Sequence, residues 1–296
     1  MKKQFAVFSA ILAAALYALN APLSKLLLQN VPPSMMAACL YLGAGAGMLI
    51  MGLVRRAAGH PSTEQPLTRR DLPYVIGMIV LDIAAPILLM LGVSRTSPEN
   101  ASLLNNFEIV ATSLIALLIF RERISRRLWV AIGLIVLSSA MLSIEDAAHL
   151  SLSAGSLFVL LACCCWGLEN NCTRMLSQSD PLQIVVVKGF GSGTGALIVA
   201  LIAGEALPSI GMAIPALLLG FVAYGLSIFF YVYAQRFLGA ARTSAYYAAA
   251  PFIGVLLSLL IFRQWPGPLF FAALAVMVFA TVLVSRDSTG SEAGHA

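Results

Sequence analysis

The 296-residue sequence is 60% hydrophobic and 10% charged, with a formal net charge of +5. Soluble domains carry about 25% charged residues, so this composition excludes a protein whose surface faces mainly water and leaves the bilayer as the solvent for most of the chain. The net positive charge does not indicate a nucleic-acid partner, because the positive-inside rule predicts basic cytoplasmic loops in any membrane protein.

About ten apolar segments follow one another along the chain, each long enough to cross a bilayer as a helix. The first follows Lys2 and Lys3 and continues past any plausible signal-peptide cleavage site, so we interpret it as a permanent helix. The sequence therefore predicts an all-α integral membrane protein. The expected helices cover residues 4–28, 34–54, 72–93, 98–120, 128–144, 154–177, 181–203, 214–235, 243–262 and 268–285.

The Lys and Arg residues predict the orientation of these helices. With both termini in the cytoplasm, fourteen of the eighteen basic residues lie on the cytoplasmic side, and only Lys25, Arg95 and Arg263 lie outside. Lys188 falls within the seventh helix. We therefore expect a multi-pass protein of a bacterial inner membrane, with residues 287–296 as a polar, disordered cytoplasmic tail.

An internal repeat divides the chain into residues 1–147 and 148–286. Each half has five expected helices, and because five is odd, the second half must enter the membrane with the opposite polarity. Such inverted repeats surround a midplane site and favour alternating access over a static pore. The glycines of the repeat predict close helix packing or, alternatively, gating by the second and seventh helices. A shift of 148 residues superposes Pro33, Gly43, Gly45 and Gly47 on Pro181, Gly191, Gly193 and Gly195.

Ten helices in two inverted halves, with a fourth helix ending in Leu-Leu-Ile-Phe120-Arg121-Glu122-Arg123-Ile124, resemble the drug/metabolite transporter superfamily and its EamA-type exporters. The resemblance covers roughly residues 4–285. It implies a proline in the fourth helix of each half, which Pro251 matches and Ile109 does not. It also implies a cavity lined mainly by helices 1, 3, 4, 6, 8 and 9.

Four ionisable residues are expected at membrane depth, where each costs about 2.5 to 3.5 kcal/mol and needs a partner or a function. Glu169 and Lys188 lie at similar depth on sequential helices and could form a structural ion pair. Asp82 and Glu108 have no evident basic partner, so we expect their charge to be met by a proton, a bound cation or a cationic substrate group. Both are candidates for a proton or substrate site, with a hydrogen-bonded structural role as the alternative.

Amide and aromatic side chains flank these acids. They could line a wet cavity, although hydrogen bonds between helices and ordinary packing are equally common uses. The repeat pairs Tyr17 with Trp166 and Asn20 with Glu169; small multidrug transporters, which the chain resembles at superfamily level, use a glutamate in the corresponding helix. Asn105 and Glu108, three residues apart, would share one helix face. The candidate binding residues are Tyr17, Asn20, Asn105, Asn106, Trp166, Asn170, Asn171 and Tyr246.

The chain contains no nucleotide-binding loop and no zinc-protease motif, so we expect no cofactor, no bound metal and no catalytic residue. The sequence predicts a monomeric or weakly dimeric secondary transporter that exports a small metabolite, such as an amino acid-like, nucleobase-like or organic cationic solute, in exchange for protons. The alternatives are an intramembrane enzyme that uses Glu108 or Glu169 as acid or base, and a passive channel.

Overall fold

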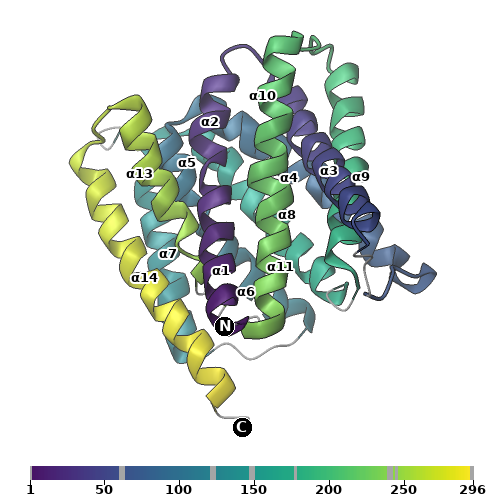
Figure 1. The fold of residues 1–296 in the computed structure, drawn as a ribbon. Helices are drawn as coiled ribbons and strands as arrows, with labels where there is room; N and C mark the ends of the chain where they lie inside the picture. Colours follow the sequence, from purple (N-terminus) through teal and green to yellow (C-terminus); the bar gives the residue numbers. More distant parts are fainter. Residues whose placement is uncertain are drawn as a thin grey trace.

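The computed structural model describes residues 2–59, 64–120, 125–146, 151–176, 179–238, 243 and 246–293. The chain forms a bundle of helices in which α1 begins and α14 ends at the same end (Figure 1). Within the described residues, seven helical segments are long and apolar enough to cross a membrane. The all-helical prediction is confirmed, apart from a short antiparallel pair of β1 (Ile144–Asp146) and β2 (Ser151–Leu152) between the two halves.

The expected transmembrane segments correspond to helices that are continuous in some cases and divided in others. The first half contains α1 (Lys2–Ala18), α2 (Asn20–Leu27), α3 (Pro33–Ala57), a 3-10 turn η1 (Arg69–Asp71), α4 (Leu72–Arg95), α5 (Pro98–Leu104), α6 (Phe107–Phe120) and α7 (Arg126–Ser143). The second half contains α8 (Ala154–Met175), α9 (Pro181–Ile202), α10 (Ile210–Gly220), a π-helical segment η2 (Phe221–Leu226), α11 (Ser227–Leu238), α13 (Ala250–Phe262) and α14 (Pro268–Ala293).

In the first half, two segments predicted as single helices are broken in the interior; in the second half, the expected helix 243–262 is interrupted by a turn before α13. The first breaks at Leu19, between α1 and α2, because Pro22 has no N–H to bond the carbonyl of Ala18. The fourth breaks at Asn105 and Asn106, between α5 and α6, where two successive asparagines favour turn geometry over helix. Broken helices expose backbone polar groups at membrane depth, which is tolerated where they line a cavity or are buried in protein.

The last helix, α14, continues to Ala293 and so extends into the polar C-terminal segment. Residues 121–124, which carry the Arg-Glu-Arg motif, lie outside the described residues.

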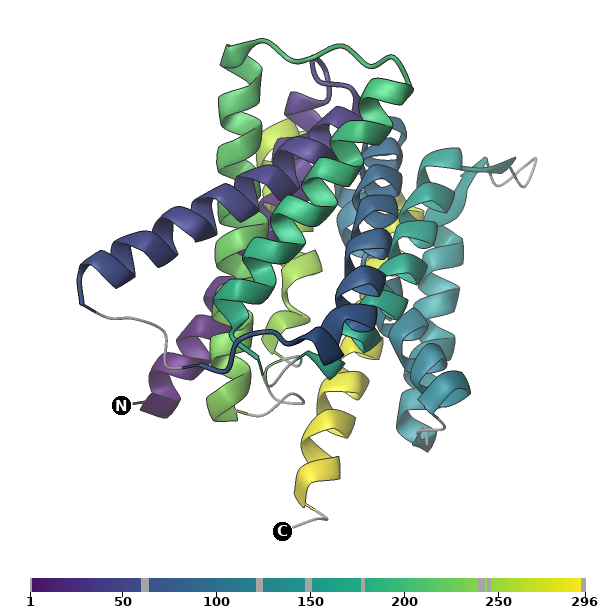
Figure 2. The same cartoon turned by 90° about the vertical axis from the view of Figure 1, so that its right-hand side faces the viewer.

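Two of the repeated glycines, Gly45 and Gly193, lie where α3 crosses α9, a crossing that Figure 2 shows from the side. A Cβ on Gly45 would be 2.9 Å from the Phe190 backbone nitrogen of α9, and one on Gly193 would be 2.7 Å from the Leu42 nitrogen of α3. The two helices therefore pack backbone against backbone, which only small residues allow. This crossing packs a helix of the first half against a helix of the second.

Candidate functional site

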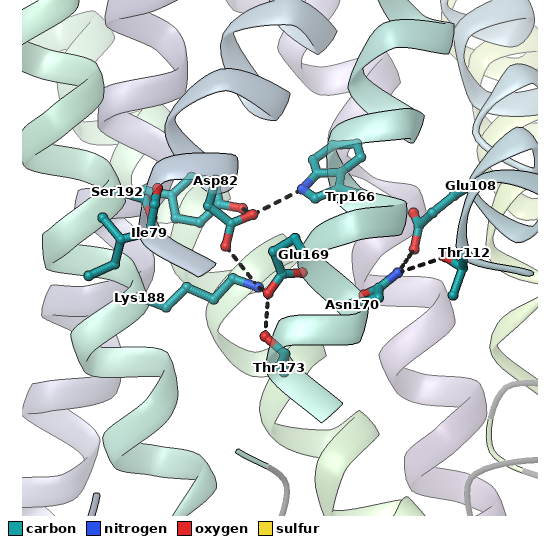
Figure 3. A network of polar contacts seen from close by, with 11 residues as sticks. Ile79, Asp82, Glu108, Thr112, Trp166, Glu169, Asn170, Thr173, Lys188 and Ser192 are labelled. Carbon is teal, nitrogen blue, oxygen red and sulfur yellow. Dashed lines mark hydrogen bonds and ion pairs between the residues drawn. The ribbon is translucent and has the colours of Figure 1, made fainter. Parts of the chain in front are cut away.

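The interior of the bundle holds a cluster of two carboxylates and one ammonium, drawn in Figure 3. Lys188 of α9 places Nζ 2.9 Å from Asp82 Oδ2 of α4 and 3.0 Å from Glu169 Oε1 of α8. All three residues are buried, with exposed fractions of 7%, 0% and 2%. The expected pairing of Glu169 with Lys188 is present.

The prediction that Asp82 lacks a basic partner is wrong, because Lys188 serves both acids. Asp82 also accepts two hydrogen bonds at Oδ1, from the Tyr41 hydroxyl at 2.9 Å and from the Trp166 indole nitrogen at 3.1 Å. The Thr173 hydroxyl donates to Glu169 one turn along α8. Four helices thus converge on one charged centre, and α3, which carries Tyr41, connects it to the crossing with α9.

The charge of this cluster is not balanced. With all three groups ionised, two carboxylates face one ammonium and leave a net charge of −1, and the hydroxyl and indole donors reduce its cost without cancelling it. A proton or a cation is the simplest means of neutralising that excess in an environment that excludes water.

Glu108, at the start of α6, lies on the other side of α8 (Figure 3). Its Oε1 accepts a hydrogen bond of 2.6 Å from Asn170 Nδ2, and the same amide nitrogen lies 3.4 Å from the Thr112 hydroxyl. Within the described residues, no ion pair is formed by Glu108. Because Glu169 and Asn170 are consecutive on α8, this helix contacts both acidic centres at once.

Asn105 and Glu108 lie on either side of the break between α5 and α6, and the Glu108 N–H donates to the Asn105 carbonyl across it at 3.1 Å. Asn105 lies against a narrow pocket bounded by the first break, α5 and the start of α13. Its lining includes Tyr17, Asn20, Ser102 and Asn105, which carry polar groups, and Pro251 and Gly254 of α13. The pocket therefore joins the two broken helices of the first half to the second half.

A row of tyrosines extends from this pocket to the charged cluster. The ring of Tyr17 packs edge-on against Tyr224 and is tilted against Tyr247, each at a centroid distance of 5.9 Å. Tyr224 in turn packs against Tyr41 at 5.1 Å, and its hydroxyl accepts a hydrogen bond of 3.0 Å from Asn20. Since Tyr41 binds Asp82, aromatic contacts connect the pocket and the cluster.

Other predicted residues have local roles. The amide of Asn171 donates to the Gly167 carbonyl of its own helix at 2.8 Å, and that of Asn106 donates to the Leu103 carbonyl at 3.2 Å. Tyr246 is 39% exposed, and its neighbour Tyr247 is the residue that joins the tyrosine row.

Sequence reasoning missed two residues that complete the site, Tyr41 and Ser102. Their signal is faint, because a single tyrosine or serine in an apolar helix is ordinary. In the described part of the chain, no three His, Cys, Asp or Glu side chains gather in a way that could hold a metal ion.

Comparison with known proteins gives a consistent picture. The model of the EamA-like transporter family matches residues 4–144 and again residues 153–286. A protein of Methanothermobacter thermautotrophicus called "Uncharacterized transporter" is 26% identical over 89% of this chain and 81% of its own length. The "Uncharacterized transporter YyaM" of Bacillus subtilis is 22% identical over 89% and 87%. A solved crystal structure superposes with a TM-score of 0.69 at 16% identity over 96% of both chains, a likeness of fold.

Proposed function

The chain belongs to the EamA-like transporter family, and from this premise we propose that it is a secondary active transporter that exports a small solute in exchange for protons by alternating access. It is a multi-pass membrane protein, and its family and relatives are transporters. The proposal concerns what drives transport and which residues carry it.

The observation that carries the proposal is the excess of carboxylates over cations in the interior of the bundle. The buried carboxylates of Asp82 and Glu169 share the ammonium of Lys188, and Glu108, on the other side of α8, has only neutral hydrogen-bond partners within the described residues. An ionised carboxylate without a cation is costly at membrane depth, so Glu108 favours either a proton or a cationic solute nearby. A site that holds either the proton or the solute, but never both at once, couples the movement of protons in one direction to the movement of the solute in the other.

Helix α8 provides a physical link between the two acidic centres. It holds Glu169 against Lys188 on one side and Asn170 against Glu108 on the other, so a change in the charge of Glu108 alters the hydrogen bonds that fix α8. In our proposal the halves, residues 1–147 and 148–286, tilt against each other about the glycine crossing of α3 and α9. The cavity between them then faces each side of the membrane in turn.

The test is proton release upon addition of a solute to purified protein in weak buffer, with amino acids, nucleobases and organic cations screened in turn. We expect release with the wild type and its loss in Glu108→Gln, because glutamine keeps an acceptor for Asn170 but cannot titrate. Glu205→Gln is the matched control, since the Glu205 carboxylate accepts from the Ser34 and Met35 backbone nitrogens at the start of α3, away from the acidic network.

Either of two results would refute the assignment. Solute binding without proton release would refute proton coupling. Unchanged release in Glu108→Gln together with its loss in Glu169→Gln would move the coupling role from Glu108 to the lysine cluster.

A further inference from the structure

We propose that the pocket between the α1–α2 break, α5 and α13 binds a primary ammonium group of the transported solute. The inference rests on the proposed transport function and names its substrate class: small solutes that carry a protonated amine with free N–H groups. It is drawn from the hydrogen-bonding capacity of the pocket walls.

Two buried polar atoms in the pocket walls have no hydrogen-bond partner within the described part of the chain, Ser102 Oγ and Asn105 Oδ1. Ser102 is only 3% exposed. Leaving such groups unsatisfied costs about 1 to 3 kcal/mol each, so native proteins rarely do so without a ligand or water to complete them. Both atoms can accept a hydrogen bond.

A third acceptor comes from the helix break. Pro22 lacks the N–H that would bond the Ala18 carbonyl in a continuous helix, and Ala18 lines the same pocket. The second half leaves space beside it: a Cβ on Gly254 would lie 2.8 Å from Ser102 Oγ and 3.4 Å from the Ala18 oxygen. Gly254 therefore keeps open the space between two of the acceptors.

The other amide in the pocket is already committed. Asn20 donates from Nδ2 to the Tyr224 hydroxyl, and its Oδ1 accepts from Ser24 at 3.0 Å. The Asn20 side chain is thereby fixed by its own partners, and Ser102 Oγ, Asn105 Oδ1 and the Ala18 carbonyl oxygen are the acceptors left to a ligand. A primary ammonium has three N–H donors and no acceptor, which matches three acceptors around one small space.

Charge and aromatic surface favour the same ligand. Tyr17 lines the pocket, and its ring begins the row of tyrosines that reaches the Asp82 carboxylate through Tyr224 and Tyr41. The faces of tyrosine rings attract cations. A carboxylate ligand would instead be repelled by the surplus acids, and a quaternary ammonium would leave the acceptors unsatisfied because it has no N–H group.

The experiment measures the dissociation constant of n-butylammonium for the full-length protein in detergent by titration calorimetry. Butyltrimethylammonium and butyrate are the comparison probes. The variants are Ser102→Ala and Asn105→Leu, with Ser139→Ala as the matched control. Ser139 Oγ is also buried without a partner within the described residues, but Ser139 does not line the pocket. Neither serine variant removes a hydrogen bond of the free protein, so both should fold as the wild type does.

We expect the wild type and Ser139→Ala to bind n-butylammonium equally, and Ser102→Ala and Asn105→Leu to bind it about tenfold more weakly or worse, since each removes a hydrogen bond to a charged group. Butyltrimethylammonium should bind at least tenfold more weakly than the primary amine, and butyrate should not bind. Equal binding of the two ammonium probes, or unchanged affinity in Ser102→Ala, would overturn the proposal; the latter result would indicate that the pocket only holds water.

The result also separates this inference from the proposed function. If n-butylammonium does not bind the wild type while another class of solute causes proton release, the amine assignment is wrong and the transport proposal stands. If no solute causes proton release but n-butylammonium binds as expected, the pocket assignment holds and proton coupling fails.

Discussion

Gly43 of α3 and Gly195 of α9 both belong to the repeated glycines, yet the structure predicts different consequences for Gly43→Ala and Gly195→Ala. A Cβ on Gly43 would lie 2.0 Å from the Leu217 carbonyl oxygen of α10, and the Leu217 C and Cα atoms follow at 2.7 Å. A Cβ on Gly195 would lie 2.1 Å from Ile83 Cδ1, the tip of a flexible side chain. The first clash is with backbone and the second is with a movable group.

The expected free-energy cost of each substitution depends on which atoms must move to make room for the new Cβ. At Gly43 ordinary contact begins at 3.4 Å, so α10 would have to shift by more than 1 Å, and overpacking of this kind costs about 1 to 3 kcal/mol or more. At Gly195 the tip of Ile83 can rotate away. Alanine also favours a helix interior over glycine by about 1 kcal/mol, which offsets part of the cost.

Double-mutant cycles in detergent, with the thermal midpoint as readout, test this reasoning. In an Ile83→Ala background the nearest remaining atom, Ile83 Cβ, is 3.8 Å away, so Gly195→Ala should become neutral or stabilising. In a Leu217→Ala background Gly43→Ala should destabilise as strongly as before, because every clashing atom belongs to the backbone. Rescue of Gly43→Ala by Leu217→Ala would refute the backbone packing of α3 on α10.

Two further predictions concern the ammonium groups of Lys188, which is buried, and Lys25, which is partly exposed. Lys188→Met should destabilise the protein by about 3 to 5 kcal/mol, because it leaves Asp82 and Glu169 buried without a cation. Adding Asp82→Asn and Glu169→Gln to this variant should reverse most of the drop in its thermal midpoint. Lys25 Nζ donates to the carbonyls of Val93, Ser94 and Thr96 at 2.7, 3.1 and 2.7 Å. Lys25→Met should therefore lower the free energy of unfolding by about 1.5 to 3 kcal/mol. An unchanged thermal midpoint would show that this contact is dispensable.

The sequence was sufficient for features that depend on local pattern. Apolar segments of helical length predicted the helices, because the bilayer fixes how long a spanning element must be. The pairing of Glu169 with Lys188 followed from similar depth on two consecutive helices. Pro22 and the Asn105–Asn106 pair also carried the signal for the helix breaks, since proline and asparagine disfavour a helix interior, but the continuous apolar character of both segments outweighed it.

Contacts between helices that are distant in sequence could not be predicted in the same way. Asp82 meets Lys188 only because α4 packs against α9, and the pattern of one sequence does not fix which helices are neighbours or how each is rotated. The contact of Tyr41 with Asp82 depends on the same arrangement. Likewise, Tyr247 and not Tyr246 faces inward because the chain forms a turn immediately before α13.

The glycine contacts also show where the two halves have diverged. Gly43 and Gly47 meet Leu217 and Phe221, and their repeat partners Gly191 and Gly195 meet Ile79 and Ile83, so a shift of 138 residues relates the contacted positions. By the same shift of 138 residues, Gly220 is the repeat counterpart of Asp82. By the shift of 148 residues, Leu40 is the repeat counterpart of Lys188.

Gly220 and Leu40 do meet, since a Cβ on Gly220 would lie 2.0 Å from the Leu40 carbonyl oxygen. One interface therefore holds an ion pair where its counterpart holds a tight apolar backbone contact. Because backbone contacts do not respond to protons, a change in protonation can act directly on only one of these two interfaces, that of α4 with α9. If the halves tilt as we propose, the contact of α3 with α10 and η2 then serves as the fixed side of that movement.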